Sequence, residues 1–185
     1  MLSSDAEILF AHALKKPREF VIAHPEYRPT VWQHLKLKYY LQQRKKGMPI
    51  AYITGHKEFF GLDFIVNKHV LIPRPETEVL VEAVLHRLSE QRPANPEKSG
   101  RAELGAGSEQ KILLIDVGTG SGCIPIATMK TLKQENAAAE QYKKITVCAT
   151  DISQDALIIA KKNAKKHDVD ITFLHGDLLE PIFYK

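Results

Sequence analysis

The first part of the chain has the hydrophobic pattern of helices. Apolar residues recur at helical spacing after Ser4, and the run Ser-Asp-Ala-Glu that begins there has the form of a capping box, so we expect a helix to start at this point. A longer helix is predicted from about Thr30 to Lys46. Its apolar positions are Val31, Leu35, Tyr39 and Leu41.

The pattern changes after residue 50. Residues 59–66 are aromatic and β-branched around a single glycine, Gly61, which predicts a β-hairpin. Two prolines stiffen the turn that follows, and a helix is expected from there to about Gln91. The residues expected to face inward on this helix are Val81, Val84, Leu85 and Leu88.

A repeating α/β pattern occupies the last part of the chain. Residues 92–110, rich in Pro, Gly, Ser and charge, are interpreted as a flexible insertion that precedes it. The near-continuous apolar run 111–117 is typical of a parallel strand that is covered on both faces. Two further strands are predicted at 145–150 and 171–175, with a helix before each. This order of elements predicts the first half of a doubly wound α/β sheet.

Composition excludes several classes of protein. With 185 residues, 44% hydrophobic and 26% charged, the chain is unlike disordered, collagen-like or coiled-coil sequences. No apolar run reaches the roughly 18 residues of a membrane span, and the N-terminus lacks the basic start of a secretory signal. The two cysteines, Cys123 and Cys148, do not form a disulfide scaffold or zinc pattern. We therefore expect a soluble cytoplasmic protein.

Charge is distributed unevenly along the chain. Residues 1–75 contain 12 Lys and Arg against 6 Asp and Glu, whereas residues 76–185 contain 14 against 16. This difference predicts two modules, the first of which meets an acidic partner or RNA. The alternative is an ordinary solvated helix face, because five of the basic residues share one helical run. They are Lys36, Lys38, Arg44, Lys45 and Lys46.

A glycine-rich loop stands where the first parallel strand turns into a helix. The sequence from Asp116 to Gly122 is DVGTGSG, which leaves bare backbone and helix N–H groups for a nucleotide-like ligand. A dinucleotide fingerprint needs a third glycine at position 123, where Cys123 stands. The observed form is typical of methyltransferases that bind S-adenosylmethionine, and a glycine turn without a ligand is the alternative. The candidate cofactor-binding residues here are Gly118, Thr119, Gly120, Ser121 and Gly122.

Acidic residues follow the next two predicted strands. Asp151 stands where a carboxylate accepts hydrogen bonds from the two ribose hydroxyls of a nucleotide, or alternatively caps the following helix. Asp177 is placed to accept the adenine amino group, with Leu178 covering the ring, and a simple turn is the alternative. The eight histidines show no metal-ligand spacing, and Cys123 is interpreted as small apolar packing and not as a nucleophile. No catalytic or metal-binding residue is therefore assigned.

Five strings of the sequence together resemble one known family. GMPIAYITG from Gly47 and VLIPRPETE from Val70 precede the glycine loop, and DIS from Asp151 and GD from Gly176 follow it. In this order they closely resemble the HemK/PrmC family, the peptide chain release factor glutamine N5-methyltransferases. The resemblance covers nearly the whole chain apart from residues 92–110.

The resemblance implies a domain plan and a function. It implies an N-terminal helical substrate-recognition domain at 1–49, a hairpin linker at 50–75, and the N-terminal half of a Rossmann-like S-adenosylmethionine-dependent methyltransferase domain at 76–185. Family members methylate the side-chain amide nitrogen of the GGQ glutamine of class I peptide chain release factors. The implied partners are these release factors, without a membrane and without sequence-specific nucleic acid binding.

The resemblance also implies roles for individual residues. The glycine loop is expected to hold the methionine part of the cofactor, Asp151 the ribose, and Asp177 with Leu178 the adenine. Three residues of the PRPETE string are expected near the substrate pocket, although a structural role in a helix-entry turn explains them equally well. They are Arg74, Glu76 and Glu78.

One family signature does not occur in these 185 residues. Asn-Pro-Pro-Tyr fixes the substrate amide nitrogen in line with the sulfonium methyl group, and the chain ends at Lys185 without it. The family usually also has a helix before the DAEIL segment, so we expect a chain truncated at both ends with little or no catalysis. Residues 112–117 are then expected to form an exposed edge strand that leaves the chain marginally stable or self-associating. The alternative is a catalytically inactive cofactor- or partner-binding fragment. A nucleic-acid amino-methyltransferase is disfavoured by the PRPETE string, and a nicotinamide oxidoreductase by Cys123.

Overall fold

The computed structural model describes residues 4–90, 111–135 and 145–183. It divides the chain into two compact units, Met1–His56 and Lys57–Lys185, and each is described by itself. The insertion expected at residues 92–110 lies outside the described residues. Among the residues that are described, no helix has the length and apolar character needed to cross a membrane.

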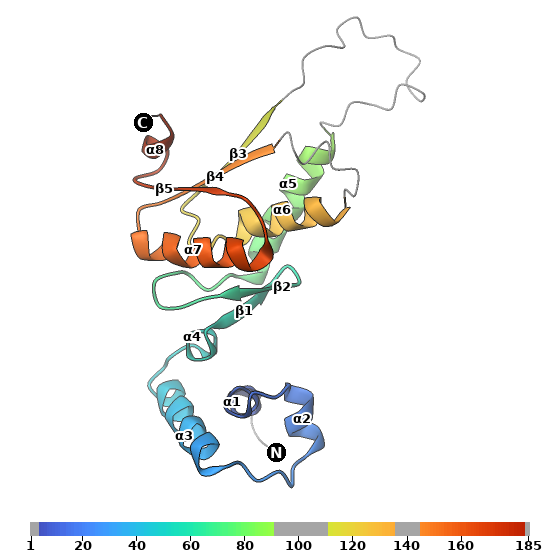
Figure 1. The fold of residues 1–185 in the computed structure, drawn as a ribbon, viewed down its shortest axis with the longest axis vertical. Helices are drawn as coiled ribbons and strands as arrows, with labels where there is room; N and C mark the ends of the chain where they lie inside the picture. Colours follow the sequence, from blue (N-terminus) through green and yellow to red (C-terminus); the bar gives the residue numbers. More distant parts are fainter. Residues whose placement is uncertain (1–3, 91–110, 136–144, 184–185) are drawn as a thin grey trace, which may run out of the picture. The chain divides into compact units, whose positions relative to one another are not determined.

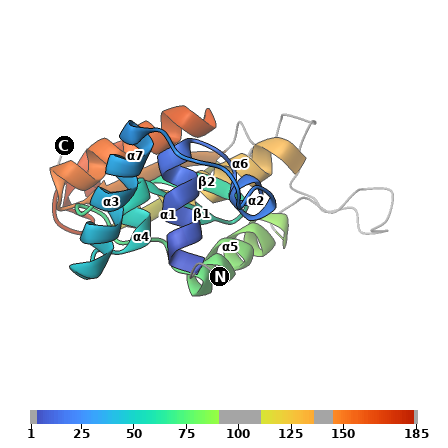
Figure 2. The same cartoon turned by 90° about the horizontal axis from the view of Figure 1, so that it is seen from below.

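The first unit is built from four helices. α1 (Ser4–Leu14) packs against both α2 (Arg18–Ala23) and α3 (Val31–Lys45), and the short α4 (Ile50–Thr54) follows (Figure 2). Apolar side chains of α1 and α2 form the small core of the unit. Its buried members are Ala11, Leu14 and Val21, with Phe10, Phe20 and Tyr27 packed against them.

The capping box of the first unit lies at α3, not at α1. At α1, Ser4 already belongs to the helix, and the Glu7 carboxylate accepts hydrogen bonds from the Arg18 guanidinium at 2.6 and 3.0 Å. At α3, Thr30 Oγ1 accepts from the Gln33 N–H at 3.3 Å, and Gln33 Oε1 accepts from the Thr30 N–H at 2.9 Å. The predicted helix start is thus confirmed for both helices, whereas the side chains expected to cap α1 bind elsewhere.

One side of α3 is apolar but exposed. Of the four apolar positions predicted for this helix, only Leu41 is half-buried, and no residue of α3 is fully buried. Helical spacing identifies the residues that share a face, but it does not decide whether that face meets the core or solvent. We call the exposed apolar residues the α3 stripe. They are Val31, Trp32, Leu35 and Tyr39, with exposed fractions of 75%, 77%, 50% and 56%.

The predicted hairpin is confirmed. β1 (His56–Phe59) pairs with β2 (Leu62–Ile65), and Phe60 and Gly61 make the turn in left-handed backbone conformation, with φ of 52° and 70°. The side chains of Phe59 and Phe64 are 1% and 0% exposed and meet edge to face, with ring centroids 6.0 Å apart. Burial of these two rings fixes the hairpin in the second unit.

The rest of the second unit is a parallel α/β sheet with the predicted order of elements. The strand order is β3-β4-β5 with both pairs parallel, so each strand lies beside its predecessor (Figure 1). This confirms a Rossmann-like α/β fold represented by its first three strands. The elements are η1 (Pro75–Thr77), α5 (Glu78–Glu90), β3 (Ile112–Val117), α6 (Cys123–Glu135), β4 (Ile145–Asp151), α7 (Gln154–His167), β5 (Thr172–His175) and α8 (Glu180–Phe183).

The two faces of this sheet differ. Val147 and Ala149 of β4 are buried, at 3% and 0% exposed, on alternate positions that share one face. On the other face, Leu113 of β3 is 53% exposed and its register partner Thr146 is also exposed. The prediction of a strand covered on both faces is therefore wrong for β3 within the described part of the chain. The strand order also leaves the outer edge of β3 without a described partner strand.

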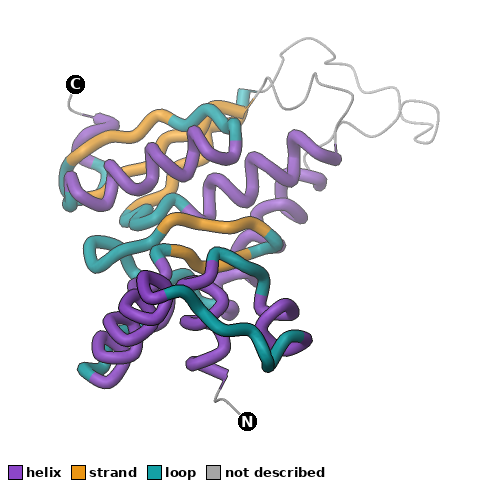
Figure 3. Tube along the Cα trace, turned by 60° about the horizontal axis from the view of Figure 1, so that its bottom comes forward, coloured by secondary structure: helices purple, strands orange, loops and turns teal. Residues whose placement is uncertain are grey.

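Helix α7 lies between the parallel sheet and the hairpin (Figures 1 and 3). It contacts β4 and β5 on one side and β2 on the other. On the β2 side, Lys166 bonds to the carbonyl and carboxylate of Asp63, and His167 Nε2 lies 3.0 Å from the same carbonyl. α7 thus joins the hairpin to the sheet, and its first turn lies beside the loop that follows β4.

Candidate functional site

The glycine loop between β3 and α6 is held by backbone hydrogen bonds to the neighbouring strand. The N–H groups of Gly118 and Thr119 both donate to the Thr150 carbonyl at 2.9 Å. Within the loop, the Gly122 N–H donates to the Thr119 carbonyl at 2.8 Å. The three glycines of the loop adopt left-handed φ values between 55° and 77°, which other residues rarely reach. The sequence therefore forms a tight turn with little side-chain cover at the carboxyl end of the sheet.

Gly122 also permits a close approach of two helices. A Cβ atom at this position would lie 2.8 Å from Ile126 Cδ1 of α6 and 3.3 Å from Ala160 Cβ of α7. A Cβ atom here would displace the end of the Ile126 side chain and crowd Ala160, so glycine lets the helix after the loop start directly against α7.

Asp151 stands at the end of β4 and contacts two loops. Its Oδ2 accepts from the Gly120 N–H at 2.8 Å, and its Oδ1 accepts from the Ser153 N–H at 2.8 Å. Ser153 Oγ in turn caps α7 by accepting from the Ala156 N–H at 3.2 Å. The helix-entry role expected as an alternative is thus present. The half-buried carboxylate still has lone pairs free to accept ligand hydroxyls.

Three buried polar atoms without a hydrogen-bond partner belong to the glycine loop and the end of β3. Among the residues that the structure describes, they are Asp116 Oδ2, Thr119 Oγ1 and Ser121 Oγ. Buried polar atoms in folded proteins are nearly always hydrogen bonded, so three such atoms in one place indicate a site that a polar ligand completes. Thr119 and Ser121 are only 6% and 2% exposed.

Asp116 was not among the residues assigned to the site from sequence. Burial raises the pKa of its carboxyl group, the nearby Thr119 hydroxyl opposes this rise, and the charge of Asp151 adds to it. A carboxylate that burial penalises in this way is stabilised by a cationic ligand group. The signal in the sequence was an acid at the end of an otherwise apolar strand.

The residues that follow β5 are brought to the same edge of the sheet. The Gly176 N–H donates to the Asp151 carbonyl at 3.1 Å, and Thr150 Oγ1 donates to the Leu178 carbonyl at 2.7 Å. Leu178 has a left-handed φ of 45°, and its apolar side chain is 66% exposed. Asp177, which precedes it, is also exposed. Strained backbone at an exposed apolar residue is characteristic of ligand-binding sites.

Ile152 is a second exposed apolar residue at this edge that sequence reasoning did not assign. It follows Asp151 directly and is 71% exposed. His175 Nε2 lies 3.0 Å from its carbonyl oxygen, which ties the end of β5 to this turn. Ile152 and Leu178 therefore offer exposed apolar surface directly after Asp151 and Asp177, at the carboxyl ends of β4 and β5.

The three residues predicted for the substrate pocket lie around the short helix η1. Glu78 Oε1 accepts from the Phe60 N–H at 2.9 Å and so joins α5 to the hairpin turn. Arg74 is the N-cap residue of η1, and both Arg74 and Glu76 are exposed. The structure thus gives Glu78 a role in the helix-entry turn, while a role in substrate binding stays a prediction for all three residues.

The surroundings of Cys123 agree with the prediction that it is a small packing residue and not a nucleophile. Burial raises the pKa of its thiol to about 11, and the nearby Ser121 hydroxyl and backbone groups oppose this rise in part. At neutral pH the group is therefore a thiol and not the thiolate that acts as a nucleophile. The described residues include no group of three or more His, Cys, Asp or Glu side chains placed to hold a metal ion.

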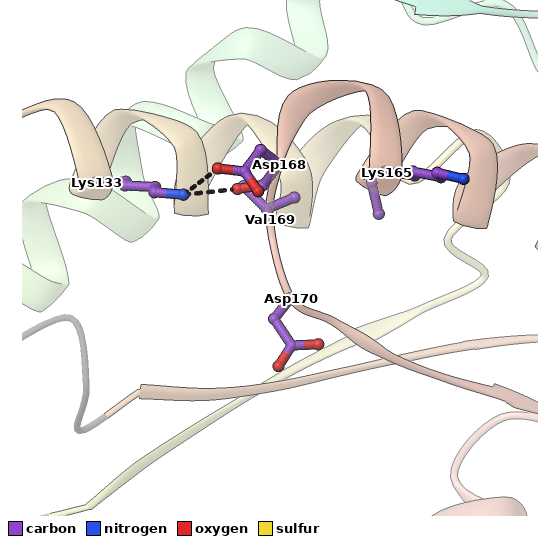
Figure 4. A pocket seen from close by; sticks show the side chains of 6 residues that line it. Lys133, Lys165, Asp168, Val169 and Asp170 are labelled. Carbon is purple, nitrogen blue, oxygen red and sulfur yellow. Dashed lines mark hydrogen bonds and ion pairs between the residues drawn. The ribbon is translucent and has the colours of Figure 1, made fainter.

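A pocket of about 300 Å³ lies at the other edge of the sheet (Figure 4). It is lined by the end of α6, the end of α7 and the connection to β5, which all belong to the amino edge of the parallel strands. Lys133 Nζ in this pocket donates to the carbonyl oxygen of Asp168 at 3.0 Å and pairs with its carboxylate (Figure 4). The pocket is therefore separate from the glycine loop at the carboxyl edge. Its lining residues are Lys133, Ala164, Lys165, Asp168, Val169 and Asp170.

Known proteins with similar sequences match nearly the whole length of this chain. Residues 3–55 match the family model of the PrmC N-terminal domain. The release factor glutamine methyltransferase of Coxiella burnetii is 39% identical over 174 residues, which are 94% of this chain and 53% of that protein. The protein of the same name from Bacillus anthracis is 36% identical over 177 residues, 96% of this chain and 54% of that protein. This chain therefore spans about half the length of these relatives.

Similarity to solved structures is more remote. Human methyltransferase 10 domain containing protein matches with a TM-score of 0.42 and 20% identity, over 68% of this chain and 48% of that chain. The sequence matches are the stronger finding, since they include both the helical first unit and the segment that carries the glycine loop. By sequence, the chain is similar to release factor glutamine methyltransferases along nearly its whole length, and residues 3–55 match the PrmC N-terminal domain.

Proposed function

We propose that the carboxyl edge of the sheet binds S-adenosylmethionine, and that the chain serves methyl transfer to the side-chain amide nitrogen of the GGQ glutamine of class I release factors. The observation that carries the proposal is the set of three buried, unpartnered polar atoms around the glycine loop, next to Asp151. The similarity to release factor glutamine methyltransferases supports the choice of cofactor and substrate.

The residues at this edge fit the parts of the cofactor. Four N–H groups of the loop from Gly118 to Gly122 already donate within the protein, so the loop offers the hydroxyls of Thr119 and Ser121 to the carboxylate and amino group of the methionine part. The cofactor carries positive charge on its ammonium and sulfonium groups, which complements the buried carboxylate of Asp116.

The nucleoside part fits the ends of β4 and β5. Asp151 is assigned to the ribose hydroxyls because its carboxylate lies half-buried at the end of β4. Asp177 is assigned to the adenine amino group, and Leu178 and Ile152 offer the apolar surface against which a base packs.

S-adenosylmethionine supplies a methyl group on a sulfonium centre, which an amide nitrogen accepts by direct displacement. The residues described above bind and orient the cofactor, and none of them is assigned to hold the glutamine amide, because Asn-Pro-Pro-Tyr does not occur in residues 1–185. Arg74, Glu76 and Glu78 are proposed to face the substrate from the turn before α5.

The first unit is proposed as the part that recognises the release factor. The α3 stripe is exposed, and α3 carries four Lys and Arg residues and no acidic residue. Such a surface fits a partner with apolar side chains surrounded by acidic ones. We therefore propose that the acidic partner of the basic N-terminal part is a protein and not RNA.

Calorimetric titration of S-adenosylmethionine into the chain of 185 residues tests the cofactor site. We expect binding in the micromolar range, and we expect Asp151→Ala to abolish it, because this change removes the ribose acceptor and frees the Gly120 N–H. Asp170→Ala is the matched control, since this exposed carboxylate lies at the amino edge of the sheet. Circular dichroism of each variant verifies that it is folded.

Two outcomes of this experiment decide the proposal. Absence of binding by the unmodified chain, or equal binding by Asp151→Ala, contradicts the cofactor site. Transfer of a labelled methyl group to a class I release factor tests the reaction itself. Binding without transfer supports the alternative of a cofactor-binding fragment that is catalytically inactive.

A further inference from the structure

Asn163 of α7 is fully buried and uses its whole side-chain amide. Its Oδ1 accepts from the Ile65 N–H at 2.8 Å, and its Nδ2 donates to the Ile65 carbonyl at 3.0 Å and to the Ser121 carbonyl at 2.9 Å. These bonds fix the orientation of the amide, because only its oxygen can face an N–H and only its nitrogen can face two carbonyls. One side chain thus contacts both the hairpin and the glycine loop.

The bond to Ser121 acts on the part of the loop that faces the proposed cofactor. The Ser121 carbonyl belongs to the peptide unit whose nitrogen is the Gly122 N–H, and that N–H closes the turn onto the Thr119 carbonyl at 2.8 Å. Fixing the carbonyl therefore fixes the plane of this peptide unit. The unpartnered hydroxyl of Ser121 is attached to the same residue, so its direction depends on the same contact.

The bonds to Ile65 act on the outer edge of the hairpin. Both polar backbone groups of Ile65 are occupied by the amide of Asn163, and Lys166 and His167 of the same helix contact the Asp63 carbonyl. Three side chains of α7 thus bond to the hairpin, those of Asn163, Lys166 and His167. Of these three, Asn163 is the one that also bonds to the glycine loop. This difference separates Asn163 from its neighbours on the helix.

We propose that Asn163 is a positioning residue that sets the glycine loop for cofactor binding and couples that loop to the β1–β2 hairpin. The proposal rests on the proposed function, because it concerns the loop assigned to S-adenosylmethionine. Asn163 touches neither cofactor nor substrate in this assignment and acts through the Ser121–Gly122 peptide unit. Cofactor binding at the loop then also stabilises the position of the hairpin, because the Asn163 side-chain amide bonds to both.

Variants of α7 test the proposal by separating loop positioning from hairpin attachment. Asn163→Ala removes all three bonds, and Asn163→Asp keeps an acceptor for the Ile65 N–H but turns an oxygen toward two carbonyls. The matched control is Lys166→Met, which loses the contact with Asp63 and leaves the glycine loop unchanged. We expect both Asn163 variants to bind S-adenosylmethionine about tenfold more weakly or worse. Lys166→Met should lower the melting temperature with affinity within about twofold of the unmodified chain.

Equal affinity of the unmodified chain and Asn163→Ala, measured well below the melting temperature of both, overturns the proposal. If the unmodified chain itself does not bind S-adenosylmethionine, the proposed function fails, and hydrogen exchange of the Gly122 amide decides the positioning role without any ligand. Faster exchange of that amide in Asn163→Ala than in Lys166→Met supports the role, and equal exchange contradicts it.

A second measurement uses the unmodified chain and so does not depend on whether a variant folds. Hydrogen exchange of the Gly122 and Ile65 amides is followed with and without S-adenosylmethionine. Because one amide group holds both places, we expect the cofactor to slow exchange at Ile65 together with exchange at Gly122. Slowing at Gly122 with no change at Ile65 shows that the two places are uncoupled and overturns the proposal.

Discussion

At the scale of single residues, the candidate site depends on positions that combine a structural and a ligand-binding role. Asp151 accepts hydrogen bonds from two backbone N–H groups and still has lone pairs for a ligand, whereas one carboxylate oxygen of Asp116 is buried and accepts no hydrogen bond. The first residue thus shapes the loop around it. The second carries an electrostatic cost that a bound cation relieves, which is a common feature of binding sites.

Gly122 allows a direct test of packing at this scale. Gly122→Ala places a methyl group 2.8 Å from Ile126 Cδ1 in a left-handed backbone conformation, so we expect it to lower the free energy of unfolding by about 2–5 kcal/mol. Gly61→Ala is the control, because its φ of 70° is similar to the 77° of Gly122 but nothing lies within 4 Å. The control should cost about 1–2 kcal/mol. Urea denaturation gives both values, and equal losses contradict the role of the α6–α7 contact.

At the scale of elements, α3 and α7 use their surfaces differently. α7 is partnered on several sides, since it contacts β2, β4 and β5 and contributes Asn163 to the glycine loop. α3 contacts α1 and α4 on one side and leaves the α3 stripe open to solvent. Exposed apolar groups of this kind, concentrated on one helix, indicate an interaction surface.

The α3 stripe predicts a measurable loss of partner binding. The double variant Trp32→Ala, Tyr39→Ala removes the two aromatic side chains, and we expect it to weaken binding to a class I release factor by about tenfold or more. The free energy of unfolding should change little, because both residues are more than half exposed. Biolayer interferometry measures the affinity, with Ile22→Ala on α2, 59% exposed, as the control. Unchanged affinity of the double variant would place the contact elsewhere.

At the scale of the molecule, the open face and edge of the sheet are the dominant feature of the second unit. β4 is paired on both sides, whereas the outer edge of β3 has no partner strand among the described residues and Leu113 beside it is 53% exposed. An apolar edge strand of this kind is a template for pairing with another chain. The helices α6 and α7 protect only one face of the sheet.

This edge predicts self-association of the 185-residue chain. In sedimentation velocity we expect the average sedimentation coefficient to rise with concentration as chains pair through β3. Leu113→Lys places a charge on the exposed face beside the edge, which natural sheets use to block such pairing, so this variant should sediment as a monomer. Val79→Lys on α5, where the side chain is 65% exposed, controls for added charge alone. A chain that stays monomeric at every concentration contradicts the prediction.

The sequence by itself determined the elements and the chemistry that is local to them. Periodicity predicted the five longer helices among the described residues, the hairpin and the parallel strands within a few residues, because side-chain spacing follows directly from backbone geometry. It did not predict the short helices α2, α4 and α8, which span at most six residues each and so show too little of a repeat. The glycine loop was recognisable because a strand-to-helix turn with three left-handed positions needs glycine. The capping of α7 by Ser153 is local in the same way, since a cap acts on residues of its own turn.

Only the tertiary structure decided which of these residues meet. Asn163 lies 98 positions from Ile65 and 42 from Ser121, and no pattern within one helix shows that its amide reaches both. In the same way, the spacing of Val31, Leu35 and Tyr39 shows that they share a face, but their exposure depends on where α1 packs. Local sequence fixes conformation through short-range sterics and hydrogen bonding, whereas burial and long-range contacts depend on the packing of the whole unit.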